Sequence, residues 1–168
     1  KDFYNREQAR SRIDTDRTAT GAPVIQEIKL NAELRTILAV ICNLELYYLL
    51  HEQLTVNDFE DPLAKQLFII LEECSREEGL SIHRVLNYCQ NEELKQLITK
   101  AVSSKEFEIN NLQYVQESIR NIRKQSLERQ GKKLLRKISD FKPVTPDDHK
   151  TLAQFLAEKM EIDRKLQE

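Results

Sequence analysis

The chain of 168 residues contains no tryptophan and only three glycines, three cysteines and four prolines. Three glycines are too few for the glycine-rich loops that cradle phosphates, or for the many turns of an all-β fold. The scarcity of glycine and proline therefore favours a helical protein, and the length suffices to bury a real core. Because the chain begins at Lys1 and its single methionine is Met160, we expect it to be a fragment or a processed product.

Long apolar runs are also missing from the sequence. The longest, such as 37–42 and 67–71, are far shorter than the roughly 20 residues that a membrane helix requires, and no signal peptide is recognisable. Cys42, Cys74 and Cys89 form no C-x-x-C pair and lie in apolar stretches, where small buried side chains are expected. These absences predict a cytoplasmic protein without a membrane partner.

Apolar residues recur at intervals of three and four along most of the chain, which is typical of amphipathic helices. Residues 1–29 lack this period and are expected to form a flexible linker or tail. Beyond them, one helix is predicted to begin at Asn31 and another to span 44–54, followed by a turn at 55–59. A further helix runs from Asp61 and Pro62 to about 78, and two more begin at Ser81 and at Asn91. The last two predicted helices cover 111–139 and 146–167. We expect an all-α fold, in which a helical bundle is followed by a long helix and a C-terminal two-helix hairpin.

The predicted long helix carries two apolar stripes. At about 100° per residue, the stripe in its second half is rotated by roughly 120° from the stripe in its first half. The first comprises Leu112, Val115, Ile119 and Ile122, and the second comprises Leu127, Leu134, Leu135 and Ile138. We therefore expect a bundle subdomain over 30–125 and a hairpin arm over 126–168, with Gly131 as a point of flexibility. Two helices cannot hide wide apolar stripes, so some flanking residues are expected to stay exposed for docking, namely Phe155, Met160 and Ile162.

Charge is segregated, although the net charge is only −2. Residues 31–110 hold 7 Lys and Arg against 14 Asp and Glu, a balance of −7, whereas 111–139 hold 8 against 2, a balance of +6. Five cations face away from the second stripe, namely Arg129, Lys132, Lys133, Arg136 and Lys137. Their mutual repulsion favours an anionic partner. No aromatics alternate with them for stacking on a single strand, so we expect a protein partner and weak or absent nucleic-acid contact.

The sequence offers little for catalysis or metal binding. His51, His83 and His149 lie on separate predicted elements, none with a His or Cys three or four residues away, and the motif G-x-S-x-G is absent. The four glutamates between positions 72 and 78 are interpreted as a solvated helix surface. A cation-dependent helical enzyme built on them is an alternative. We expect no catalytic residue, no metal and no cofactor in this fragment.

The order of these segments resembles the C-terminal helicase-binding domain of bacterial DnaG-type DNA primases. The resemblance covers about residues 30–168. It is carried by an amphipathic first helix containing 33–38, by a loop ending in Asn-Asp-Phe at 57–59, by the Asp-Pro helix start at 61–62, and by a long helix leading into a terminal hairpin. The resemblance implies a fragment that follows the zinc-binding and polymerase domains of such an enzyme.

The resemblance also implies that the hairpin docks on the N-terminal collar of the hexameric replicative DnaB-type helicase, while the bundle modulates helicase and primase activity. The parent enzyme would make RNA primers, and this fragment, a monomer, would not. Carried over to this chain, the expected contacts are Lys133, Lys137, Lys150, Leu152, Phe155, Leu156, Lys159, Ile162 and Lys165. Two further interpretations stay open: the N-terminal collar domain of the helicase itself, and a nucleic-acid binder that uses the basic helix.

Overall fold

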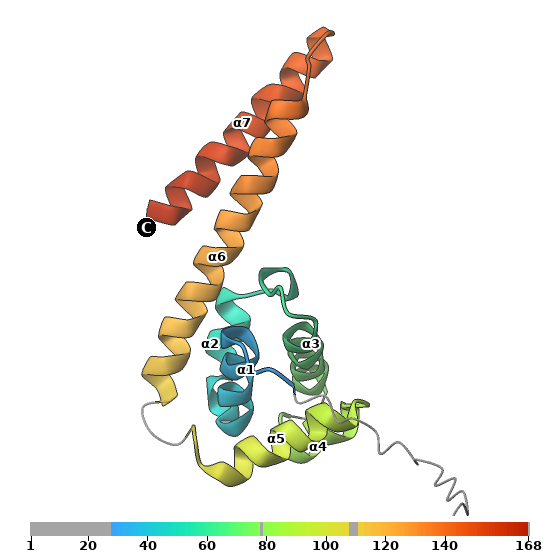
Figure 1. Cartoon of the computed structure of the whole chain (residues 1–168), viewed down its shortest axis with the longest axis vertical. Helices are drawn as coiled ribbons and strands as arrows, with labels where there is room; N and C mark the ends of the chain where they lie inside the picture. Colours follow the sequence, from blue (N-terminus) through green and yellow to red (C-terminus); the bar gives the residue numbers. More distant parts are fainter. Residues whose placement is uncertain (1–27, 78, 108–110, 168) are drawn as a thin grey trace, which may run out of the picture.

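The computed structural model describes residues 28–77, 79–107 and 111–167, and within these ranges every regular element is a helix (Figure 1). In chain order the elements are α1 (Ala32–Cys42), the 3-10 helix η1 (Leu44–Leu46), α2 (Tyr47–Gln53), the 3-10 helix η2 (Val56–Asp58), α3 (Pro62–Arg76), α4 (Ile82–Tyr88), α5 (Glu92–Ser104), α6 (Asn111–Asp140) and α7 (Pro146–Gln167). The predicted all-α fold, long helix and terminal hairpin are confirmed. Of the predicted linker 1–29, only residues 28 and 29 lie within the described ranges.

Side-chain caps fix the starts of four bundle helices. Asn31 accepts a hydrogen bond of 2.8 Å from the amide three positions on and so opens α1. Asp61 accepts from the amides two and three positions on, both at 2.8 Å, directly before Pro62. Ser81 and Asn91 cap α4 and α5 in the same way. Each cap pairs an N–H group that has no partner within the helix, and all four predicted starts are confirmed.

Helix α1 lies at the centre of the bundle, in contact with α2, α3, α5 and the first half of α6 (Figure 1). Its sequence explains this position, because over 34–41 every residue except Arg35 is buried. The core continues into α3, where Phe68 is fully buried and its ring centroid lies 5.2 Å from that of Phe59. Within the described ranges, no single helix has the length and hydropathy of a membrane span. Only α1 and the helical segment 44–53, counted together, have that length and hydropathy, and the chain bends by 115° between them.

Carboxylates hold the α2–α3 loop in place. Sequence alone predicts a turn here, and the loop contains η2, which Thr55 and Asp58 close with a capping box. The buried carboxylate of Glu33, from α1, accepts hydrogen bonds from the backbone amides of Glu60 and Asp61, both at 2.8 Å. Because unpaired amides are costly in a protein interior, Glu33 ties the loop firmly to α1. The loop thereby provides a fixed surface on which α6 packs.

Helix α6 packs on the bundle with its first half and on α7 with its second half, as the two stripes predict (Figure 1). The buried residues of the first half include Val115, Ile119 and Ile122. Two predicted stripe positions are wrong, because Leu112 and Leu135 are 50% and 51% exposed. Successive residues are about 100° apart on a helix, so only one of Leu134 and Leu135 can face α7. Leu112 lies in the first turn of α6, about 60° around the helix from Val115.

Helix α7 runs back along the second half of α6 as an antiparallel partner (Figure 1). The two helices come close at Gly131, where an added Cβ would lie 3.6 Å from Cγ2 of Ile162 and 3.8 Å from Cε of Lys159. Near the far end of the hairpin, Phe141 and Phe155 pack edge to face with ring centroids 5.7 Å apart. Both distances are ordinary van der Waals contacts, so the approach of α7 does not require a glycine, and α6 continues through this position without a break.

Candidate docking surface of the hairpin

The structure places the nine predicted contact residues on both helices of the hairpin. Lys133 and Lys137 lie exposed on α6, and the other seven lie on α7. Three of those seven are exposed and four are only partly accessible. The exposed ones are Lys150, Leu156 and Lys165, and the partly accessible ones are Leu152, Phe155, Lys159 and Ile162.

The partly accessible residues serve the packing of the hairpin. Phe155 meets the ring of Phe141, and Ile162 and Lys159 lie over Gly131. The ammonium group of Lys159 is paired with Asp163, one turn further along α7, and only 18% of the lysine side chain is exposed. Their role as partner contacts stays a prediction. A partner that engaged their packed atoms would have to open the seam between α6 and α7.

A second apolar line on α7 is exposed to solvent. Its members are spaced three and four residues apart, so they share one side of the helix: Ala153, Leu156, Ala157 and Met160. We call these four residues the α7 apolar face. Leu156 is 48% exposed and Met160 is 73% exposed, whereas Phe155 and Ile162, predicted to be exposed with Met160, are largely covered. Sequence reasoning missed the two alanines, although the 3–4 spacing was the available signal.

Helix α6 presents a row of cations beyond the bundle. Lys132, Lys133, Arg136 and Lys137 are all exposed, and we call them the basic face. None of the four pairs with an acidic side chain in the parts of the chain that the structure describes. Like charges along one helix side repel one another, so an anionic partner surface would relieve that repulsion. Arg129, predicted to belong to this group, does not, because it is bonded to the bundle.

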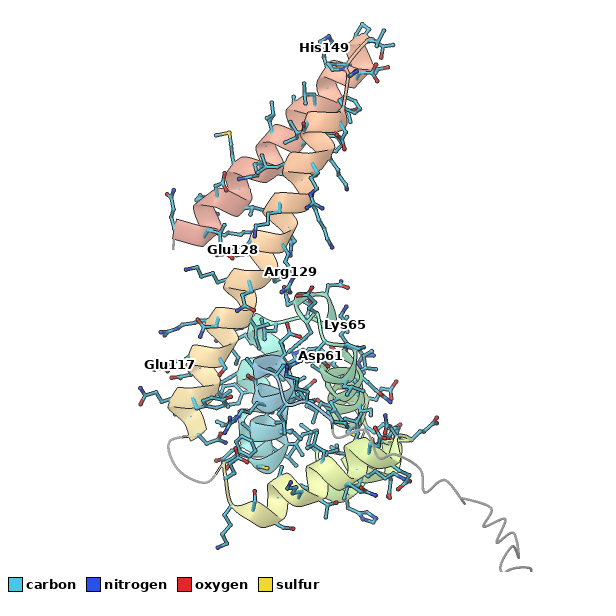
Figure 2. All side chains as sticks on the ribbon, in the orientation of Figure 1. Asp61, Lys65, Glu117, Glu128, Arg129 and His149 are labelled. Carbon is cyan, nitrogen blue, oxygen red and sulfur yellow. The ribbon has the colours of Figure 1, made fainter. Side chains whose placement is uncertain are left out.

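Arg129 and Ser126 fasten the middle of α6 to the α2–α3 loop. The guanidinium of Arg129 donates to the backbone carbonyl of Asp58 and, at 3.5 Å, to the carboxylate of Glu60. The hydroxyl of Ser126, which is 2% exposed, donates to Oδ1 of Asp58 at 2.7 Å. Figure 2 shows Arg129 at the level where the hairpin leaves the bundle. We call these contacts the joint, since they link the middle of α6 to the bundle at the base of the hairpin.

Two carboxyl groups of α7 have lowered pKa values. The carboxylate of Asp148 accepts hydrogen bonds from the amides of Thr145, at 2.7 Å, and Val144, at 3.0 Å, and these bonds lower its pKa. The hydroxyl of Thr145 accepts in return from the amide of Asp148 and so caps the start of α7. Hydrogen bonding from Arg164 lowers the pKa of Glu161 to about 2. Both carboxyl groups are therefore ionised at neutral pH, where they stabilise α7.

Other candidate chemistry is sparse in the described ranges. No three His, Cys, Asp or Glu side chains there are grouped so as to hold a metal ion. Of the glutamates considered as a cation site, Glu77 accepts from the hydroxyl of Tyr88 at 2.6 Å, and Glu72 lies 3.8 Å from Nε2 of His51. Burial raises the pKa of the Cys74 thiol, which disfavours the reactive thiolate. The α7 apolar face and the basic face are thus the strongest candidates for the functional site.

Comparison with known proteins adds one relationship. No family model matches the chain, and no solved structure matches it. A DNA primase from Treponema pallidum (strain Nichols) is 35% identical to it over 137 residues, which cover 81% of this chain and 23% of that protein. The chain spans about a quarter of the length of this curated relative. The similarity that the order of helices predicts is thereby confirmed.

Proposed function

This chain is related to a DNA primase through 81% of its length, and from that relationship we propose that it is a protein-interaction domain of a bacterial primase. In this proposal the hairpin docks on the N-terminal collar of the hexameric replicative DnaB-type helicase. Docking couples primer synthesis to the unwinding of duplex DNA at the replication fork in the cytoplasm.

The observation that carries the proposal is the α7 apolar face. Leu156 and Met160 place large apolar side chains in water on a helix that packs mainly against α6. Leu135 of α6 is similarly exposed, at 51%. Exposed apolar residues that cluster on one surface favour a protein interface, because their burial removes apolar area from water. A helix in a groove is a common form of such an interface.

The basic face supports an acidic surface on the partner. Lys133 and Lys137 extend from the side of α6 that does not pack on α7, so they meet a partner without opening the hairpin. Complementary charge mainly accelerates association and selects the partner, while apolar burial slows dissociation. We therefore propose that the basic face accelerates association with the partner and that the α7 apolar face slows dissociation from it.

The remaining parts of the chain support the hairpin within this proposal. The bundle and the joint hold the hairpin in a set direction, and the chain is a monomer that uses no metal or cofactor of its own. Primer synthesis belongs to the other parts of the primase.

The test is size-exclusion chromatography with light scattering, on this chain mixed with the helicase hexamer of the same organism. We expect co-elution for the wild-type chain and for Val144→Asp, because Val144 is 85% exposed and lies outside the α7 apolar face. We expect Leu156→Asp and Met160→Asp to abolish co-elution while melting at the wild-type temperature. Both substitutions add the same charge as the control, so a loss confined to them identifies the docking surface.

Two results would contradict the proposal. Co-elution that survives Leu156→Asp and Met160→Asp, alone and combined, would remove the α7 apolar face from the interface. Failure of the wild-type chain to co-elute with the helicase would rule out docking itself. Self-assembly of the chain into a ring without added helicase would support the alternative, a helicase collar domain.

A further inference from the structure

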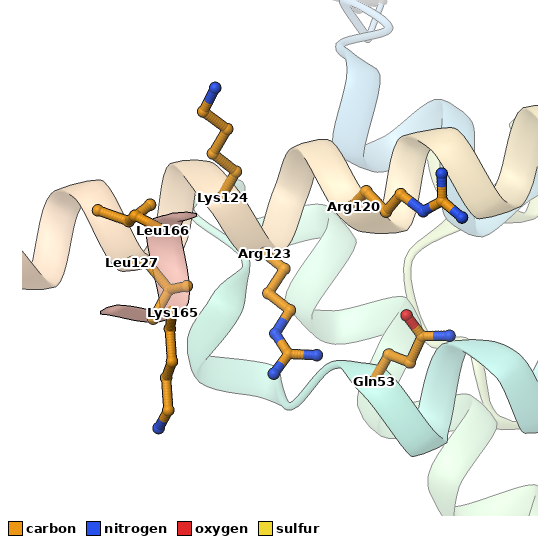
Figure 3. Close-up of a pocket in the computed structure, with 7 residues that line it drawn as sticks. All are labelled: Gln53, Arg120, Arg123, Lys124, Leu127, Lys165 and Leu166. Carbon is orange, nitrogen blue, oxygen red and sulfur yellow. The ribbon is translucent and has the colours of Figure 1, made fainter. Parts of the chain in front are cut away.

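A cleft of about 370 Å³ opens at the base of the hairpin, where the end of α7 faces α6 and the end of α2 (Figure 3). Its lining includes Gln53 of α2, Arg120, Arg123 and Leu127 of α6, and Lys165 and Leu166 of α7. Figure 3 shows Arg123 reaching from α6 toward Gln53, with Lys165 extending on the same side of α6. Residues that are far apart in the sequence, on three helices, therefore line one space.

The cleft carries uncompensated positive charge. Four of its seven lining side chains are cationic and none is acidic, the fourth cation being Lys124 at its edge. Arg120, Arg123 and Lys124 form no ion pair with any carboxylate that the structure describes. Lys165 lies 3.5 Å from Oε1 of Glu161, an oxygen that Arg164 also binds, at 2.8 Å. The lining itself is therefore positive, although Glu161, Glu117 and Glu128 lie on the same helices outside it.

We propose that this cleft binds the phosphate groups of a nucleotide-sized ligand. A guanidinium presents a planar fork of N–H donors that matches two oxygens of a phosphate, and Arg123 and Arg120 supply two such forks. A phosphate carries more charge and more acceptor oxygens than a carboxylate, so it suits a site that several cations line. Leu127 and Leu166 add an apolar side to the lining.

The shared chemistry has two sources, a free nucleoside triphosphate and the backbone of a single strand. No aromatic residue is among those that line the cleft, so we expect no stacking and no preference among bases. The inference does not depend on helicase docking, because the cleft lies at the base of the hairpin and shares no residue with the α7 apolar face or the basic face.

The experiment measures binding of two probes to the chain in the absence of helicase. ATP binding is followed by calorimetry, and binding of a fluorescein-labelled twelve-nucleotide thymidine strand by anisotropy over a series of salt concentrations. The test variant is Arg123→Glu, and the matched control is Lys100→Glu, which changes the charge equally at an exposed position on α5, at the other end of the bundle (Figure 1). Arg123→Lys keeps the charge and removes the fork.

We expect Arg123→Glu to weaken binding of the preferred probe by at least about fivefold, Arg123→Lys to weaken it less, and Lys100→Glu to leave it unchanged. If the source is a strand, log K falls with log salt by about 0.7 per phosphate contacted, and Arg123→Gln reduces that slope by about one contact. Saturable binding of ATP alone would identify a free nucleotide as the source. Absence of binding by both probes at low salt, or an equal loss in Lys100→Glu, would overturn the proposal.

Discussion

Helix α1 and helix α7 both carry a helical period of apolar residues, yet eight residues of α1 are buried and none of the described residues of α7 is. The difference lies in the neighbours. Helix α1 is surrounded by helices, whereas α7 packs mainly along α6. Periodicity reports which side of a helix packs, but the extent of burial depends on how many elements cover that side. The bundle therefore supplies the stability of the fold, while the hairpin keeps apolar surface available.

The largest expected effect separates the two regions by matched truncations. Phe68→Ala removes a fully buried ring from the bundle, so we expect a loss of about 3–5 kcal/mol in the free energy of unfolding. Phe155→Ala removes a half-buried ring from the hairpin, and we expect about 1 kcal/mol, because much of that side chain already contacts water. Urea unfolding measures both. Equal losses would show that the hairpin core is as essential as the bundle core.

A smaller effect is expected from the joint, which connects the two regions. Ser126→Ala removes the hydroxyl that donates to Asp58, at a cost of about 1 kcal/mol. Because that bond helps to fix the hairpin on the bundle, the variant should also broaden the distribution of distances between spin labels on Val144 and Lys100. Ser139→Ala, an exposed serine of the same helix, is the control. An unchanged distribution in Ser126→Ala would show that apolar packing alone directs the hairpin.

The fold could be predicted from the sequence because its determinants are local. Asn31 and Asp61 cap their helices through amides within three residues, and the two stripes of α6 follow from a fixed angle per residue. The exposure of Leu135 follows from the same angle, because Leu134 lies within about 20° of the line through Leu127, whereas Leu135 lies about 80° from it. The division into 30–125 and 126–168 stays a prediction about independent folding.

The candidate site could be predicted only in part, because most of it depends on contacts between distant segments. The bond between Ser126 and Asp58 joins residues 68 positions apart, and polar pairs of this kind leave no period in the sequence. The cleft brings Lys165 to Arg123 only after α7 has folded back on α6. By contrast, the α7 apolar face could have been predicted from the sequence, because its residues recur at intervals of three and four as regularly as those of the seam.

The smallest expected effect is the loss, at low pH, of the stabilisation that two carboxylates give to the hairpin. The pKa of Glu161 falls from its ordinary 4.5 to about 2, chiefly through the hydrogen bond from Arg164, and hydrogen bonds from backbone amides lower the pKa of Asp148. A carboxyl group with a lowered pKa stabilises the fold above its unfolded pKa, and this stabilisation is lost as the pH falls through the folded value. Hydrogen exchange of α7 amides should therefore accelerate, relative to the intrinsic rate, between about pH 4.5 and pH 2.

Glu161→Gln and Asp148→Asn isolate this effect from acid-sensitive contacts in the bundle. Since the neutral amides do not titrate, the double variant should show weaker protection of α7 than the wild type at pH 6 and nearly equal protection at pH 2. Protection of α1 should be the same in both proteins at each pH, because both positions lie in the hairpin, whereas α1 and its cap lie in the bundle (Figure 1). A wild-type advantage in α7 that persisted at pH 2 would mean that these two side chains stabilise the hairpin by packing and not by their charge.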